Sequence, residues 1–241
     1  MESFTQSIPA ALRALKAQFS SRFACPGHLA LPLIADNLFS ATGQGFAFSY
    51  GPTYLFSMPQ TLFPPCLPTR GAAVPAGPEW IHEIKHDGYH LIVQREGKRV
   101  RLFTKNGRDW TDRYPFIVEA ALRNRINSFV LDGEAVLLGV DGISDFDGLH
   151  ARRHDDEVQL YAFDILAMDG EDLRKLPLHL RKNNLARLLA RRPQGIFVSE
   201  FEQGEIGPDL FRKACEFGLE GLVSSTASAP IEPGRHRIGS R

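Results

Sequence analysis

One lysine in this chain ends an apolar run and directly precedes a turn dipeptide, within Glu83-Ile84-Lys85-His86-Asp87-Gly88. A lysine amine with an unperturbed pKa of about 10.4 is protonated and inert at neutral pH. Burial or a nearby cation lowers that pKa and turns the amine into a nucleophile. Lys85 could then attack the α-phosphorus of ATP, with Asp87 orienting the amine. The plain alternative is a hairpin that leaves Lys85 exposed.

Three further positions would suit the same chemistry, which is nucleotidyl transfer. Glu134 lies in an apolar run, and a ribose hydroxyl or a hard cation would relieve the cost of burying its carboxylate. Phe163 could stack on adenine, and Glu220 could be a second carboxylate for Mg²⁺. Taken singly, each has a structural explanation: an ion pair with an arginine for Glu134, a core position for Phe163 and a surface charge for Glu220. Nucleotidyl transfer explains all of them together.

The elements that must position these residues are mainly short strands. Alternating apolar residues predict strands near 80–84, 89–93, 100–103, 129–138, 160–166 and 197–201, and another from 222. Helices are expected from Pro115, over 178–192 and over 208–217. Asp87-Gly88 predicts a hairpin turn between the first two strands. We therefore expect an α+β domain with two mainly antiparallel sheets, flanked by helices, and a nucleotide cleft. The sequence contains neither GxGxxG nor GxxxxGK[ST], which excludes the nucleotide sites built on those motifs.

Composition limits the class of protein and the compartment that the sequence suits. The 241 residues are 43% hydrophobic and 23% charged, as in an ordinary globular domain. The net charge is zero, so we expect any hold on DNA to be weak and salt-sensitive. The basic groups at Arg99–Arg108 and Arg181–Arg192 are interpreted as solvated faces. Three cysteines without close spacing suit a reducing cytoplasm, and the lack of a long apolar run predicts no membrane span.

In their order along the chain, these motifs resemble those of the ATP-dependent DNA ligase family, and most of all the bacterial type linked to non-homologous end joining. The most specific stretches are Trp80 to Gly88, Phe129 to Glu134 and Glu220 to Val223. The resemblance implies the DNA ligase/mRNA capping nucleotidyltransferase fold, with ATP and Mg²⁺ as cofactors. It also implies nicked or broken DNA as substrate and DNA end-joining proteins as candidate partners.

The resemblance assigns a role to each candidate residue. Lys85 would carry AMP, and Asp87 would lie in the nucleotide site. Lys105 stands where the family usually has an arginine that contacts phosphate or ribose. The remaining roles are a place beside the adenine pocket for Glu83, ribose or metal contact for Glu134, base stacking for Phe163 and metal binding for Glu220.

The chain also departs from the family pattern. His90 replaces the arginine that follows the KxDG motif by two residues, and Ser225 stands where a phosphate-binding lysine is expected. Gly234-Arg235 matches, but the tryptophan expected after it is missing, and Arg241 ends the sequence near the first lysine of the last motif. Loss of a preorganised cation at a developing phosphate charge typically costs about 10²–10³ in rate. We therefore expect slow adenylation and still slower nick sealing.

Two functions stay open on the sequence. One is a DNA ligase adenylation module of impaired activity, which forms lysyl-AMP for joining strand breaks. The other is a non-catalytic remnant that binds nucleotide or DNA ends. An RNA ligase or a guanylyltransferase would use the same lysine chemistry.

The N-terminal segment differs in composition from the rest of the chain. Its first 60 residues hold only five charged side chains, and none lies between Asp36 and Arg70. We expect residues 1–62 to be a poorly ordered extension. Residues 63–241 would be the adenylation domain, with its last motif truncated and without the OB-fold domain that follows in the family.

The same contrast predicts where translation begins. Met58 opens a plausible start immediately before the compact part of the chain. We predict that the protein purified from its native host begins at Met58. An intact-mass measurement that finds Met1 or Glu2 at the N-terminus contradicts this.

Overall fold

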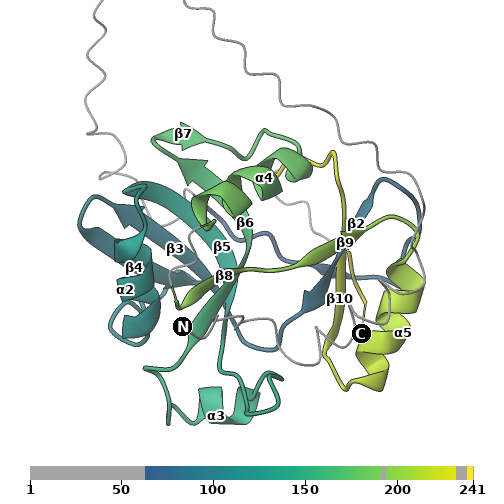
Figure 1. Cartoon of the computed structure of the whole chain (residues 1–241), viewed down its shortest axis with the longest axis horizontal. Coiled ribbons are helices and arrows are strands. Elements are labelled where there is room, and N and C mark those ends of the chain that lie inside the picture. The colour runs from purple at the N-terminus through teal and green to yellow at the C-terminus, as the bar shows by residue number, and fades with distance from the viewer. Residues whose placement is uncertain (1–62, 191–193, 232–237, 241) are drawn as a thin grey trace, which may run out of the picture.

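The structure is a computed structural model, and it describes residues 63–190, 194–231 and 238–240. Residues 1–62, with Met58 and the expected extension, lie outside the described residues, as does the Gly234-Arg235 pair. The described part forms two β-sheets with helices packed around them (Figure 1).

The first sheet has the strand order β1-β11-β10-β2-β9. Its strands are β1 (Thr69–Arg70), β2 (Trp80–Lys85), β9 (Phe201–Gln203), β10 (Gly221–Thr226) and β11 (Ile238–Ser240). The second sheet has the order β4-β3-β5-β6-β7, with β8 beside β6. Its strands are β3 (Tyr89–Glu96), β4 (Arg99–Thr104), β5 (Ser128–Val136), β6 (Gln159–Met168), β7 (Glu171–Asp172) and β8 (Ile196–Val198).

The described helices are α2 (Pro115–Arg123), α3 (Phe146–His150), α4 (Leu178–Leu188) and α5 (Gly207–Glu216). The described strand pairs are antiparallel except β1 with β11 and β6 with β8. This confirms the expected α+β fold with two mainly antiparallel sheets. No helix in the described residues is long and apolar enough to cross a membrane.

The second sheet carries the larger core. Leu91 and Leu131, on neighbouring strands, belong to one buried cluster with Ile117 of α2 and Leu185 of α4. All four side chains are fully buried, and burial of such a side chain contributes roughly 1.5–3 kcal/mol. The cluster fixes the two helices on this sheet.

A smaller core attaches α5 to the first sheet. Ile84 of β2 and Leu222 of β10 are paired neighbours, and both pack with Leu210 and Ala214 of α5. Because successive side chains of a strand point to opposite faces, Glu83, Lys85 and Val223 lie on the other face of this sheet. The alternation therefore turns the chemically active side chains away from α5.

Two of the sequence expectations were wrong. The first two strands do not form a hairpin, because β2 pairs with β9 and β10 while β3 pairs with β4 and β5. The chain crosses from one sheet to the other over His86–Gly88. The single strand expected over 197–201 is likewise two strands, since β8 joins the second sheet and β9 the first.

The basic group at Arg181–Arg192 is also not simply a solvated face. Arg181 and Lys182 are both 2% exposed. Arg181 binds the buried Asp164 of β6 through two hydrogen bonds, from Nε at 2.9 Å and Nη2 at 3.0 Å. Its Nη1 donates to the carbonyl of Ala229, after β10, at 3.1 Å. One guanidinium thus ties α4, which lies over β6 in Figure 1, to that strand and to the segment after β10.

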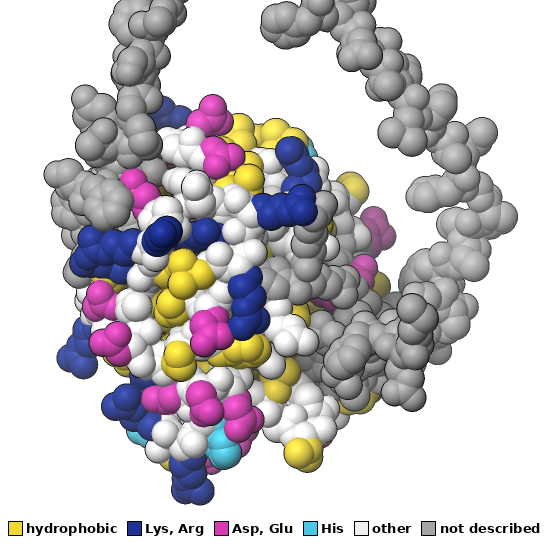
Figure 2. Space-filling model, turned by 60° about the vertical axis from the view of Figure 1, so that its left-hand side comes forward, with side chains coloured by type: hydrophobic (Ala, Val, Ile, Leu, Met, Phe, Trp, Pro, Cys, Tyr) yellow, Lys and Arg dark blue, Asp and Glu magenta, His cyan; other side chains and the backbone are white. Residues whose placement is uncertain are grey.

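Surface charge is mixed. On the face in Figure 2, Lys and Arg side chains stand in small groups among Asp and Glu, with hydrophobic side chains between them. Such a face offers no broad basic surface for the phosphates of duplex DNA.

The Arg181 contacts predict a large loss of stability on substitution. Arg181→Ala leaves Asp164 buried without its cation, which typically costs about 3–5 kcal/mol. Arg123→Ala is the matched control, because its ion pair with Glu119 is exposed on both sides and such pairs contribute about 1 kcal/mol or less. Urea unfolding of the two variants and the parent measures the difference. Equal stabilities for both variants would contradict this role of Arg181.

Candidate active site between the two sheets

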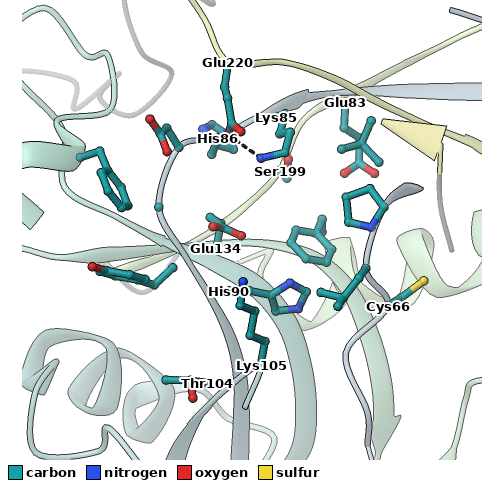
Figure 3. A pocket seen from close by; sticks show the side chains of 18 of the residues that line it. Cys66, Glu83, Lys85, His86, His90, Thr104, Lys105, Glu134, Ser199 and Glu220 are labelled. Atoms are coloured by element: carbon teal, nitrogen blue, oxygen red, sulfur yellow. Dashed lines mark ion pairs between the residues drawn. The ribbon is translucent and has the colours of Figure 1, made fainter. Parts of the chain in front are cut away.

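A cavity of about 560 Å³ lies between the sheets. Its lining contains all seven candidate residues from the sequence, namely Glu83, Lys85, Asp87, Lys105, Glu134, Phe163 and Glu220. Figure 3 shows Lys85, Glu83 and Glu220 on one side of the cavity and Glu134, His90 and Lys105 on the other. Segments far apart in sequence therefore meet in one place, although the roles of these residues remain predictions.

Lys85 sits at the end of β2, where its amine meets a carboxylate. Lys85 is opposite Gly221 in the pairing of β2 with β10, so Glu220 arrives beside it one residue earlier. The Lys85 Nζ lies 2.5 Å from Glu220 Oε2 (Figure 3, dashed line). Both side chains are mostly buried, at 23% and 15% exposure. The amine is thus held in a cavity by an ion pair and does not extend into bulk water.

The crossing after Lys85 explains why a glycine stands at position 88. A Cβ atom at Gly88 would come within 2.2 Å of the Ala135 carbonyl oxygen and 3.0 Å of the Glu134 Cγ. Only glycine allows the chain to pass this close to β5. The DG dipeptide therefore lies where the chain crosses close to β5, and this crossing brings Lys85 near Glu134.

The imidazole of His86, within the crossing, packs against the ring of Tyr161 in a tilted arrangement, with a centroid separation of 4.4 Å. Burial, and secondly the charge of Lys85, lowers the pKa of His86 to about 4. Its imidazole is therefore neutral near pH 7 and adds no positive charge beside Lys85.

Glu134 faces the same space from β5. Burial, with smaller contributions from the negative charges of Glu220 and Asp132, raises the pKa of Glu134 to about 7, although His90 and Lys85 oppose the shift. A carboxylate with this pKa is partly protonated at neutral pH. A ligand that donates a hydrogen bond to Glu134, or a cation that binds it, would favour the charged form of this carboxylate.

Phe163 reaches the cavity because β6 is irregular there. Asp132 pairs with Asp164 and Gly133 pairs with Ala162, so the pairing register of β6 with β5 skips Phe163. An extra residue of this kind is a β-bulge, which redirects side chains and is common next to active sites. The half-buried Phe163 ring lines the cavity, as does Val223 on the first sheet. The sequence predicted the ring but could not reveal the bulge.

Glu83 is a buried residue of the cavity wall, and the sequence did not reveal its ion-pair partner. Lys182 of α4 forms an ion pair with Glu83 across the gap between the sheets. The Lys182 ammonium also lies 5.2 Å from the ring centroid of Phe201. Nothing in the local sequence distinguishes Lys182 from the exposed basic residues of the same helix.

His90 and Asp132 form a second feature that sequence reasoning did not identify as a pair. The His90 Nε2 bonds Oδ1 of Asp132, which is fully buried. The His90 ring also packs edge-on against Phe163, at 5.5 Å between centroids. The departure from the family arginine is thus accommodated, because the imidazole has a buried anionic partner of its own.

Lys105 and Ser225 differ in exposure, since Lys105 is exposed and Ser225 is buried. Lys105 follows β4, is exposed, and extends along the cavity toward His90 (Figure 3). Ser225 is buried in β10, and its hydroxyl has no hydrogen-bond partner among the described residues. A serine there supplies no positive charge, in contrast to the lysine that the motif leads one to expect.

The donor set fits a hard divalent cation. The described residues contain no group of three or more His, Cys, Asp or Glu side chains arranged to hold a metal ion. Mg²⁺ does not need such a cage, because it keeps several waters and binds through one or two carboxylates plus substrate phosphates. Glu134 and Glu220 provide two carboxylates on one cavity.

Comparison with known proteins gives the family. The family model described as "ATP dependent DNA ligase domain" matches residues 72–239. A relative named multifunctional non-homologous end joining protein LigD, from Pseudomonas aeruginosa, is 36% identical over 148 residues. That match covers 60% of this chain and 18% of the relative. The SPbeta prophage-derived DNA ligase-like protein LigB of Bacillus subtilis is 30% identical, over 64% of this chain and 56% of that one.

Solved structures agree. The ligase domain of Mycobacterium tuberculosis LigD has a TM-score of 0.63 and 31% identity, covering 73% of this chain and 59% of that chain. A mycobacterial DNA ligase D complexed with ATP and MES has the same TM-score, at 30% identity and the same coverage. The chain thus spans about a fifth of the full LigD protein and over half of its ligase structures. It belongs to the ATP-dependent DNA ligase family, as an adenylation domain similar to those of the bacterial end-joining LigD proteins.

Proposed function

We propose that this domain transfers AMP from ATP to Lys85, as the first step in joining DNA strand breaks. The observation that carries the proposal is the position of the Lys85 amine. It is buried in a cavity, paired with Glu220 at 2.5 Å, and shares that cavity with Glu134 and Phe163. A nucleophile, two carboxylates and an aromatic ring are the groups that nucleotidyl transfer requires.

The reaction begins with loss of a proton from Lys85. Glu220 is in contact with the Lys85 ammonium, and we assign it as the group that orients the amine, whose proton is lost to solvent. The Lys85 Nζ then forms a bond to the α-phosphorus, and the bond from that phosphorus to the bridging oxygen of the β-phosphate breaks. Pyrophosphate leaves with that electron pair. The product is lysyl-AMP, which would pass AMP to a DNA 5′-phosphate.

The other residues would hold the nucleotide. Phe163 stacks on the adenine, and Val223 contributes an apolar surface from the first sheet. Glu83 lies beside the base. Glu134 accepts a hydrogen bond from the ribose, and Lys105 contacts phosphate or ribose. Asp87, exposed at the crossing, borders the phosphate side.

Mg²⁺ would be held by Glu134 and Glu220 together with the phosphates, and it would neutralise charge as pyrophosphate departs. Glu220 therefore has two tasks, and its pairing with Lys85 in the free protein keeps the amine positioned until nucleotide and ion arrive.

We further propose that adenylation is slow. Ser225 supplies no cation at a position where the family pattern has one, and the His90 imidazole is engaged by Asp132. Each loss of a cation at the phosphates would cost about 10²–10³ in rate. The same two features favour the second candidate function, a non-catalytic protein that binds nucleotide or DNA ends.

The substrate would be nicked or broken DNA, with end-joining proteins as partners. The names of the LigD relatives support this, since they are described as multifunctional non-homologous end joining proteins. The zero net charge and the mixed face in Figure 2 support weak, salt-sensitive DNA binding.

Replacing Lys85 tests the proposal. With α-labelled ATP and Mg²⁺, the purified parent should acquire covalent label on a denaturing gel within minutes to hours. Lys85→Ala should acquire none, since it lacks the amine proposed as the nucleophile. Lys98→Ala, which removes an exposed lysine from the turn between β3 and β4, should label like the parent.

The other outcomes separate the candidates. Absence of label on a folded parent that still binds ATP would support the non-catalytic function and overturn the enzyme. Stoichiometric label within seconds would overturn the proposal that adenylation is slow. Labelled GTP in parallel distinguishes an adenylating from a guanylylating enzyme.

Glu134 predicts a pH-dependent stability. An acid whose pKa rises on folding, here from 4.5 to about 7, binds its proton more tightly in the folded state, so stability falls as the pH rises between those values. Glu134→Gln cannot ionise and should gain stability over the parent across that range, by on the order of 2–3 kcal/mol. Urea unfolding at pH 5 and pH 8 measures this, with the exposed Glu171→Gln as control. A gain that does not change with pH would contradict the assignment.

A further inference from the structure

A second, smaller cavity adjoins the ion pair between Lys85 and Glu220, and its volume is about 120 Å³. Four residues line both this cavity and the one proposed for the nucleotide, namely Lys85, His86, Asp87 and Glu220. The rest of its lining comes from Ile84, from residues 142–144 after β5 and from residues 218–219 before β10. We call this space the rear cavity. The ion pair thus belongs to the wall that the two cavities share.

The rear cavity suits water. A water molecule occupies about 30 Å³ in the liquid, and cavities that stay empty in proteins are apolar. This one has room for a few waters, and Lys85, Asp87, Ser144 and Glu220 provide polar side chains in its lining. Asp87 is exposed, so the cavity reaches the surface at that end. Among the described lining residues Lys85 is the one lysine or arginine, beside two carboxylates, and such a lining favours a positive charge that moves away from Lys85.

The proposed reaction needs an outlet for protons. When the Lys85 ammonium becomes lysyl-AMP, its nitrogen releases one proton before the bond to the α-phosphorus forms and a second one afterwards. The attacking and leaving groups lie roughly in line, so pyrophosphate departs on the far side of the phosphorus from Nζ. The bound nucleotide therefore occupies the space in front of the amine and displaces water from it. The protons then have to leave on another side of Nζ.

We infer that the rear cavity carries the protons of Lys85 to solvent through water, and that Ser144 is a positioning residue for that water. This rests on the proposed function, because it names the proton route of the same reaction. The shared wall puts the amine in contact with both spaces. A nucleotide can then close the front of the amine while its rear remains hydrated.

The test fills the rear cavity and leaves the nucleotide cavity intact. Ser144→Leu removes a hydroxyl and adds volume at a position that lines only the rear cavity of the two. Val140→Leu, in the same loop and fully exposed, is the matched control. The first measurement is the rate at which the Lys85 ammonium protons exchange with solvent, by NMR of labelled lysine nitrogen. It is made with Mg²⁺ and α,β-methylene-ATP, which cannot lose pyrophosphate.

The second measurement is the initial rate of covalent labelling by ATP, in H₂O and in D₂O, beside equilibrium binding of ATP. These readouts separate proton transfer from nucleotide binding.

In the parent and in Val140→Leu, the ammonium protons should keep exchanging while the analogue is bound. In Ser144→Leu, exchange and labelling should both slow about tenfold or more, with a larger solvent isotope effect and unchanged affinity for ATP. The inference is wrong if the analogue alone stops exchange in the parent, or if Ser144→Leu exchanges and labels like the parent.

Should Ser144→Leu fail to fold, Ile143→Phe fills the same cavity from the adjacent position and is held to the same outcomes. A folded parent that binds ATP but never acquires label would overturn the proposed adenylation, while ammonium exchange would still decide the proton route.

Discussion

The organisation of this domain depends on one short crossing, where the chain leaves β2 and enters β3 over His86–Gly88. Two strands that are neighbours in sequence thereby belong to different sheets. The crossing is tight enough that no side chain fits at Gly88 against β5. As a result, the last residue of β2 projects into the gap between the sheets, and Lys85 is both sequestered and close to Glu134.

A gap lined by charged side chains must be held at a fixed width, and here ion pairs of α4 do so. Arg181 fixes α4 on β6 through Asp164, and Lys182 reaches across to Glu83 on β2. Hydrophobic packing would close the gap, since apolar surfaces seek contact. Buried charged pairs have directed geometry, which preserves a cavity large enough for a nucleotide. Stability and the shape of the site are therefore coupled through one helix.

Local signals in the sequence were sufficient for many of the elements and for the seven candidate residues that line the cavity. Strand alternation predicted β2, β3, β4, β5, β6 and β10, and Pro115 marked the start of α2. Local sequence did not reveal how the strands pair. The DG dipeptide suggested a hairpin, and only the tertiary contacts show that the chain crosses between the sheets there. The same holds for the bulge at Phe163 and for Lys182, whose burial depends on a partner 99 residues away. Residue type suggested the proposed chemistry, while register and long-range partners decided the geometry.

The cavity lining holds more acidic side chains than lysines and arginines. Among the described lining residues, Glu83, Asp87, Glu134 and Glu220 face only three lysines and arginines, Lys85, Lys105 and Arg108. Glu83 and Glu220 are paired with Lys182 and Lys85. Burial raises the pKa of Glu134, and the negative charges of Glu220 and Asp132 add to that rise. A triphosphate entering such a space adds several more negative charges. Under the proposed function, Mg²⁺ would offset the negative charges of the carboxylates and of the triphosphate, and Ser225 would add no positive charge of its own.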